Sequence, residues 1–212
     1  MKKFSSKEEV QVSLDFCNAY FPPGLTVDIG GYLAIQSALS QGPKVAACMA
    51  SYAPIDLKIP FFTTAYKRSM VGFPMQPVDM IEKHIASLKG DEVVSTASPP
   101  GRLDLAFASI QQGKYVELLG SDQSLFPMER LESVKDIPRL FILHGKADSA
   151  VPYQSSAAFV EKLKVTHPEV KVLYIVVDEE EHGIDAKATL DTAWLKEGLD
   201  FITPTWLGKD ST

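Results

Sequence analysis

The sequence is poor in cysteine and has no long apolar run. Its 212 residues include two cysteines, Cys17 and Cys48, which lack CxxC spacing. We therefore expect no metal-binding or redox role for either cysteine. Both thiols are expected to be buried in the protein and kept reduced by the cytoplasm. No window approaches the roughly 20 apolar residues that cross a bilayer. Residues 1–10 lack the apolar centre of a signal peptide, so we expect a cytoplasmic protein that does not bind membranes.

Positive charge is also scarce. The chain has 21 lysines and arginines against 27 acidic residues, which gives a net charge of −6 and a pI near 5.2. This acidity argues against nucleic acid or an anionic membrane as the main partner. Hydrophobic residues make up 45% of the chain and charged residues 23%, which is enough for a packed core. We expect residues 1–212 to form a single domain, or a large part of a bigger one.

The N-terminal quarter predicts two helices and a strand. A helix is predicted over residues 6–20 because it opens with a capping box, and FPPG ends it because two prolines cannot continue a helix. Gly30 and Gly31 open a second, apolar helix. The run KVAACMASY at 44–52 is short, apolar and bounded by turn residues, which predicts a strand buried on both faces.

The middle of the chain is broken into short pieces. Eight of the 14 prolines lie between Pro54 and Pro138. The best helical patterns in this stretch are residues 78–88 and residues 101–119. Short helices inserted over a sheet are typical of a substrate-covering lid, and the segment from about 54 to 136 is either such a lid or ordinary connecting structure.

The last third alternates between strands and helices. Residues 138–143 and 171–177 predict strands, while residues 155–167 and 189–206 predict amphipathic helices. A strand–helix–strand pattern places the two strands parallel in one sheet, joined by a right-handed crossover. The fold class is therefore α/β, with parallel strands and flanking helices.

An acid and a histidine follow these two strands at matching positions. Asp148 comes five residues after Leu143, and His182 comes five residues after Val177. Active-site groups in parallel sheets lie just beyond the carboxyl ends of strands. A carboxylate there holds an imidazole in one tautomer and stabilises its protonated form. Taken singly, the aspartate is typical of a helix cap or of a turn in which the side chain bonds its own backbone. The histidine alone is typical of a solvated loop. Together, their strand context favours a catalytic pair.

These segments resemble the α/β-hydrolase family, whose triad runs Ser, Asp, His along the chain. HGKADSAVPYQSSAAFVEKL is similar to its acid-turn segment, EEEHGID to its histidine loop, and GGYLAIQSAL to the helix after its nucleophile. The likeness is to esterase-like members from fungal secondary-metabolite and toxin clusters, and it covers only the C-terminal part of the fold, without the N-terminal strands. The resemblance implies hydrolysis of a small-molecule ester or acyl bond by Asp148 and His182, with no metal or organic cofactor.

The family's nucleophilic serine, within G-x-S-x-G, is absent. If the helix that follows the family's nucleophile is aligned with GGYLA, the position of the serine falls on Asp28. Two groups of family members, the haloalkane dehalogenases and the epoxide hydrolases, use an aspartate as the nucleophile. Only three residues separate Asp28 from FPPG, too few for a central strand, and Thr26 replaces the expected glycine. We therefore expect that a strand and its serine are missing before Gly30. Other serines and histidines lack the nucleophile's context or suit structural roles: Ser37, Ser40, Ser51, His84, His144 and His167.

Three functional hypotheses follow. The first is an esterase-like hydrolase whose activity is impaired, because the nucleophile and the upstream oxyanion loop are both absent. The second is a non-catalytic binding protein or a truncated gene product. The third is an epoxide or haloalkane hydrolase that uses Asp28. In each case the strand at 44–51 lacks one neighbour, so we expect a homo-oligomer or a partner chain to cover its open edge.

Overall fold

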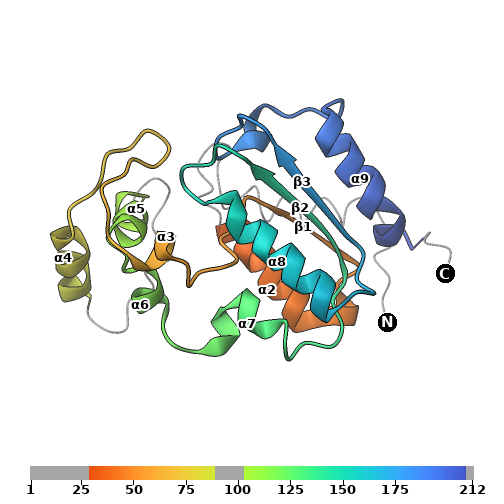
Figure 1. Ribbon diagram of the computed structural model, residues 1–212, viewed down its shortest axis with the longest axis horizontal. Helices are drawn as coiled ribbons and strands as arrows, with labels where there is room; N and C mark the ends of the chain where they lie inside the picture. The colour runs from red at the N-terminus through yellow and green to blue at the C-terminus, as the bar shows by residue number, and fades with distance from the viewer. Residues whose placement is uncertain (1–28, 89–102, 209–212) are drawn as a thin grey trace.

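The computed structural model describes residues 29–88 and 103–208 (Figure 1). Its main elements are α2 (Ile29–Gln41), β1 (Ala47–Ser51), β2 (Arg139–Gly145), α8 (Tyr153–Thr166), β3 (Val172–Val177) and α9 (Ala193–Trp206). Between β1 and β2 lie α3 (Pro60–Thr63), α4 (Asp79–Ser87), α5 (Leu103–Gln111), α6 (Tyr115–Leu119), η3 (Gln123–Leu125) and α7 (Pro127–Arg130). Two further 3-10 turns are η1 (Gly42–Lys44) and η4 (Ile184–Lys187).

The three strands form a parallel sheet in the order β1-β2-β3. Ser51 is in register with Leu143, and His144 with Val176. The α/β class and the parallel pairing predicted from the sequence are thereby confirmed. The strand predicted from residue 44 begins later, at Ala47, because Gly42–Lys44 form the 3-10 turn η1. Within the described residues, β1 pairs with β2 alone and is an edge strand of the sheet.

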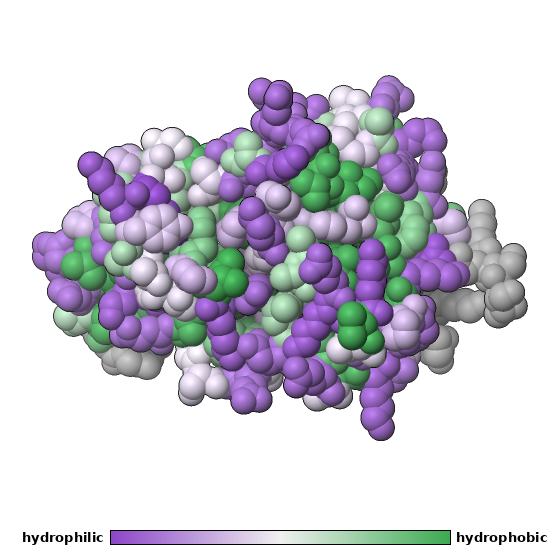
Figure 2. Space-filling model, viewed as in Figure 1, coloured by the Kyte–Doolittle hydropathy of each residue, from purple (hydrophilic) through white to green (hydrophobic). Residues whose placement is uncertain are grey.

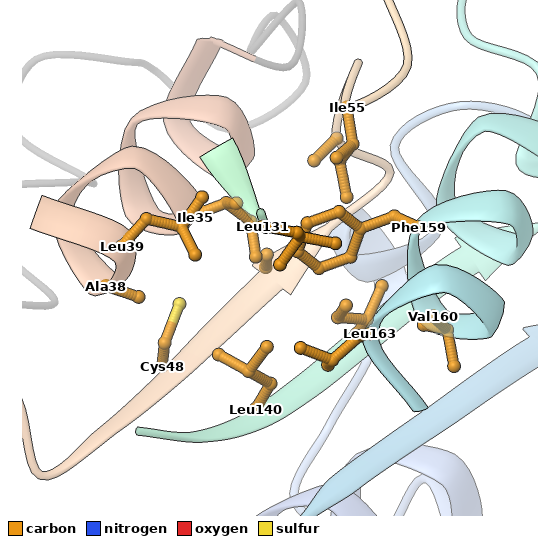
Figure 3. Close-up of a cluster of buried hydrophobic side chains, with 13 residues drawn as sticks. Ile35, Ala38, Leu39, Cys48, Ile55, Leu131, Leu140, Phe159, Val160 and Leu163 are labelled. Carbon is orange, nitrogen blue, oxygen red and sulfur yellow. The ribbon is translucent and has the colours of Figure 1, made fainter. Parts of the chain in front are cut away.

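Alternate residues of the strands face two different helical layers, as the two-residue period of a strand requires. On one face, Leu140 and Ile142 pack with Cys48 of β1 against α2 and α8. Figure 3 shows Ile35 and Leu39 of α2 on one side of this cluster and side chains of α8 on the other. These side chains are buried, so they form the main core of the fold.

The opposite face of the sheet is covered by α9. Phe141 and Leu143 are fully buried there and pack with Ile202 of α9. A Cβ atom on Gly198 would collide with the ring of Phe141. The helix therefore lies so close to β2 that a larger residue at this position would displace the ring of Phe141.

Helix α2 packs closely against the end of β1. A Cβ atom on Gly31 would lie 2.7 Å from the carbonyl oxygen of Ser51 and 2.9 Å from the Cβ of Ala53. The second glycine of the predicted GG pair is thus required for packing. A Cβ atom on Gly30, the first glycine of the pair, would meet no atom within 4 Å.

Two predicted helices differ from the structure. Residues 101–119 were predicted as one helix, but α5 ends at Gln111 and α6 begins at Tyr115. Gly113 has a φ of +65°, and the bonds Gly113 N–H to Ile110 and Lys114 N–H to Ser109 form a Schellman cap. The last helix was predicted from residue 189, but α9 begins at Ala193.

The helices α3 to α6 gather at one end of the molecule, toward which the strands run (Figure 1). Their buried side chains form a cluster of their own, which includes Phe62 of α3 and Phe107 of α5 and reaches Val151 after β2. On the face that Figure 2 shows, hydrophilic side chains are spread between separate apolar patches. No helix in the described ranges is long and apolar enough to span a bilayer.

Candidate active site

Asp148 lies in a sharp turn directly after β2. The turn continues the pairing of β2 with the chain after β3, because Lys146 N–H donates to Val177 at 2.9 Å and Ala147 N–H donates to Glu180 at 2.9 Å. A Cβ atom on Gly145 would collide with the Glu180 carbonyl oxygen. The glycine of the HG pair therefore allows the acid turn and the histidine loop to touch.

The two carboxylate oxygens of Asp148 have different partners. Oδ1 accepts hydrogen bonds from the backbone N–H groups of Ala150 (2.9 Å) and Val151 (2.8 Å). Oδ2 lies 2.9 Å from Nδ1 of His182, and the Asp148 side chain is fully buried. Asp148 therefore does not cap α8, which begins after Pro152 without a side-chain cap. Its Oδ1 bonds the backbone of its own turn, while Oδ2 faces the histidine.

The histidine loop follows β3 and presents the His182 ring, whose side chain is 8% exposed, to Asp148. The ring of Tyr52 packs edge-on against the imidazole, with 4.5 Å between ring centroids. The Tyr52 hydroxyl donates to Asp185 in the same loop at 2.8 Å. Tyr52 adopts a φ of +41°, a rare conformation for a bulky residue. Such strain is common at functional sites.

The carboxylate of Glu181 joins the two loops. Its Oε1 accepts from the backbone N–H of Ser149 at 2.6 Å and from the backbone N–H of His182 at 2.8 Å. One carboxylate therefore binds the residue that follows Asp148 and the backbone of His182 itself. This fixes the spacing of the two loops independently of the side-chain hydrogen bond.

Burial and hydrogen bonding act in opposite directions on Asp148. Burial raises the pKa of its carboxyl group, but hydrogen bonds from His144 and His182, the charge of His182 and the Val151 N–H lower it. The net result is a pKa below the ordinary value of 3.8. Asp148 is therefore a carboxylate at neutral pH, which directs the Nδ1 proton of His182 toward itself and leaves the lone pair of the neutral ring on Nε2.

A short hairpin of the α3–α6 region contacts the acid turn. Met70 and Phe73 exchange backbone hydrogen bonds of 3.0 and 2.8 Å, and the N–H of Val71 between them donates to Ser149 Oγ at 2.8 Å. Val71 has a φ of +48°, which strains a β-branched residue. The hairpin is therefore held one residue away from Asp148.

A cavity of about 360 Å³ lies against the histidine loop. Its lining includes Glu181, His182, Ile184, Lys187 and Trp194. A larger cavity of about 440 Å³ lies beside Pro43, Arg139 and Lys171, around the opposite ends of the strands. We favour the smaller cavity as the one relevant to chemistry because His182 lines it.

The remaining candidates have other surroundings. Asp28, like the helix predicted over residues 6–20, lies outside the described residues. Ser40 accepts a hydrogen bond from Arg130, and His167 bonds the Val134 carbonyl oxygen at 2.8 Å. Ser37 is exposed on α2, Ser51 ends β1, and His84 lies on α4. Among the described residues, no group of three or more His, Cys, Asp or Glu side chains could hold a metal ion.

Comparison with known proteins agrees with this geometry. Residues 111–209, which carry β2, β3 and both loops, match the prolyl oligopeptidase family, a family of α/β-hydrolases. The match spans 99 of the 212 residues and makes this C-terminal part of the chain similar to α/β-hydrolases. The resemblance of this part to the α/β-hydrolase family, predicted from the sequence, is thereby confirmed.

Two similar proteins are named as probable carboxylesterases of fungi. The chain is 29% identical over 184 residues to "Probable carboxylesterase M8" of Phoma sp., covering 84% of this chain and 57% of that protein. It is 28% identical over 129 residues to "Probable carboxylesterase clz11" of Cochliobolus lunatus, covering 58% of this chain and 59% of that protein. The chain therefore spans less than three fifths of the length of each.

A solved structure shares the fold. A crystal structure of a protein of unknown function from Staphylococcus aureus subsp. aureus Mu50 superposes with a TM-score of 0.58 at 17% identity. The match covers 94% of this chain and 71% of the other. The chain thus has a partial α/β-hydrolase fold with parallel strands and flanking helices.

Three residues of this candidate site were not predicted from the sequence. Tyr52 was counted only as the end of an apolar run, although its place just past a strand end is the position where site residues gather. Glu181 belongs to EEEHGID, which was compared with the histidine loop of the family without a role for this carboxylate. Ser149 has no signal beyond its place next to Asp148.

Proposed function

We propose that the chain is the C-terminal part of an ester hydrolase, in which Asp148 orients His182 and His182 acts as general base and then general acid. The observation that carries the proposal is the 2.9 Å hydrogen bond between Asp148 Oδ2 and His182 Nδ1, at the ends of adjacent parallel strands. In this mechanism, Nε2 of the imidazole removes the proton of the attacking hydroxyl and then delivers it to the leaving alcohol.

The proposed substrate class is a small carboxylic ester or related acyl compound of fungal secondary metabolism or toxin biosynthesis. The fungal relatives named as carboxylesterases support ester chemistry. The proposal includes a lid function for the segment from about 54 to 136, within the single domain 1–212. The contact of Val71 with Ser149 supports this, because it places the segment beside the acid turn.

We also propose that hydrolysis by the 212-residue chain is impaired. The reason is chemical: a general base needs a hydroxyl to activate, and the sequence contains no G-x-S-x-G. The same absence supports the alternative of a non-catalytic binding protein. The remaining alternative assigns the nucleophile to Asp28, with epoxides or haloalkanes as substrates.

The test is hydrolysis of an activated short-chain ester by the purified chain and by His182→Ala, with His84→Ala on α4 as control. The proposal expects slow turnover that falls by about 10²–10⁴-fold in His182→Ala and is unchanged in His84→Ala. Turnover that survives the loss of His182 would refute the assigned base. No turnover in any variant would favour the binding protein, and a covalent ester on Asp28, seen by mass spectrometry, would favour the third hypothesis.

A further inference from the structure

A second histidine lies beneath the acid turn. His144 is the last residue but one of β2, and its side chain is fully buried. Its Nε2 lies 3.0 Å from the carbonyl oxygen of Val151 and 3.3 Å from Oδ2 of Asp148, while its Nδ1 lies 2.9 Å from Oγ of Ser156. Every ring nitrogen of His144 therefore faces a polar atom inside the protein.

These partners determine where the ring proton resides. The Val151 carbonyl oxygen can only accept, so Nε2 must donate. Ser156 is fully buried, and in the described part of the chain its hydroxyl has Nδ1 of His144 as its one hydrogen-bond partner. The hydroxyl must donate to Nδ1, since its proton would otherwise be buried without an acceptor. His144 is therefore neutral, with its proton on Nε2.

We propose that His144 is a positioning residue for the Asp148–His182 pair, an inference that rests on the proposed function of that pair. Its Nε2–H, shared between Val151 and Asp148, holds the carboxylate in the orientation from which the same Oδ2 accepts from His182. His144 acts only through Asp148.

The neutrality of His144 matters for this role. A neutral N–H stabilises the carboxylate without adding a second cation beside it. A charged side chain in its place would pair with Asp148 and oppose the formation of the imidazolium on His182. Ser156 of α8 thus contributes to the site through His144 alone, by accounting for the neutral form of that ring.

His167 provides a matched control. It is also buried, at 8% exposure, and its Nε2 bonds a backbone carbonyl oxygen, that of Val134, at 2.8 Å. It follows α8 at the end remote from the acid turn. Replacing His167 therefore removes a buried histidine with a comparable structural bond and leaves the surroundings of Asp148 unchanged.

The test is nitrogen-15 NMR of the histidine rings in the full chain at neutral pH. In the wild type, His144 should be protonated on Nε2 and unprotonated on Nδ1. In His144→Leu, the hydrogen-bonded Nδ1 proton of His182 should exchange with solvent about 10-fold faster, the effect of one lost hydrogen bond. His144→Gln, whose amide can still donate to Asp148, should retain most of the protection. His167→Leu should retain it fully, although it lowers stability.

Three results would overturn the inference: a proton on Nδ1 of His144, unchanged protection in His144→Leu, or equal loss of protection in His167→Leu. Ester hydrolysis measured on the same samples separates this inference from the proposed function. Lost protection in His144→Leu together with an absence of any His182-dependent hydrolysis would support the positioning role and refute the function. His182-dependent hydrolysis together with unchanged protection in His144→Leu would support the function and refute the positioning role.

Discussion

At the scale of single residues, the two carboxylate oxygens of Asp148 have different roles, one in the structure of the turn and one in the candidate site. Oδ1 closes the turn through the N–H groups of Ala150 and Val151, and Oδ2 faces the imidazoles of His182 and His144. The backbone of the turn holds the first oxygen, and the two imidazoles hold the second. The turn therefore stabilises the carboxylate whether or not substrate is present.

This arrangement predicts a pH-dependent contribution to stability. The folded-state pKa of Asp148 is lowered, so its contribution is fully present above the unfolded-state pKa of about 3.9 and is lost as pH falls through the lower folded value. The free energy of unfolding should therefore differ most between the wild type and Asp148→Asn at about pH 5–7. The difference should shrink toward about pH 2. Urea unfolding at several pH values measures it, and a constant difference would contradict the prediction.

Gly145 offers a test of the contact between the acid turn and the histidine loop. Gly145→Ala should destabilise the fold by about 1–3 kcal/mol, because the added methyl group meets the Glu180 carbonyl oxygen. It should also weaken the hydrogen bond between Asp148 and His182. The control is Gly30→Ala, where the methyl group meets nothing within 4 Å. The measurement is the midpoint of thermal unfolding of each variant. Equal midpoints for Gly145→Ala and Gly30→Ala would show that the two loops separate without a cost in stability.

At the scale of elements, the packing of α9 on β2 depends on a glycine facing an aromatic ring. Gly198→Ala should cost about 1–3 kcal/mol through overpacking against Phe141. The same substitution in a Phe141→Leu background should cost less, because the smaller side chain leaves room. A double-mutant cycle measured by urea unfolding gives the coupling directly. Strictly additive effects would mean that α9 shifts to accept the methyl group.

The strands and the site pair were predictable from the sequence because their signals are local. Short apolar runs bounded by turn residues located β1, β2 and β3, and the matched spacing of Asp148 and His182 followed from them. The break between α5 and α6 was harder, since Gly113 ends a helix only where the chain can adopt the left-handed conformation. There, a Cβ atom would lie 2.7 Å from the backbone of Thr64, a contact that depends on tertiary structure.

The site residues contributed by distant segments were not predictable. Tyr52 contacts His182 across 130 residues of sequence, and Val71 reaches Ser149 from another part of the chain. Neither residue type carries a motif of its own. Glu181 lies in the acidic run DEEEH, and the carboxylates of such a run on a loop are usually solvated. Glu181 differs because the acid turn brings the N–H of Ser149 to its carboxylate. Only the folded structure supplies that group.

At the scale of the whole molecule, the edge of the sheet leads to a prediction about assembly. β1 is an edge strand within the described residues, and an exposed edge is a template for pairing with another chain. We expect a homo-oligomer, a bound partner chain or a marginally stable monomer. Sedimentation velocity combined with thermal unfolding tests this. A monomer that unfolds cooperatively at high temperature would contradict it.

The register of the sheet has a consequence for the order of folding. Leu140 pairs with Val172 about 30 residues away, whereas Ala47 pairs with Arg139 about 90 residues away across all of α3 to α7. Closing the shorter loop costs less entropy, so β2, α8 and β3 should associate before β1 docks. Asp148 and His182 both belong to this early unit, and their hydrogen bond should form before Tyr52 arrives to restrict the imidazole.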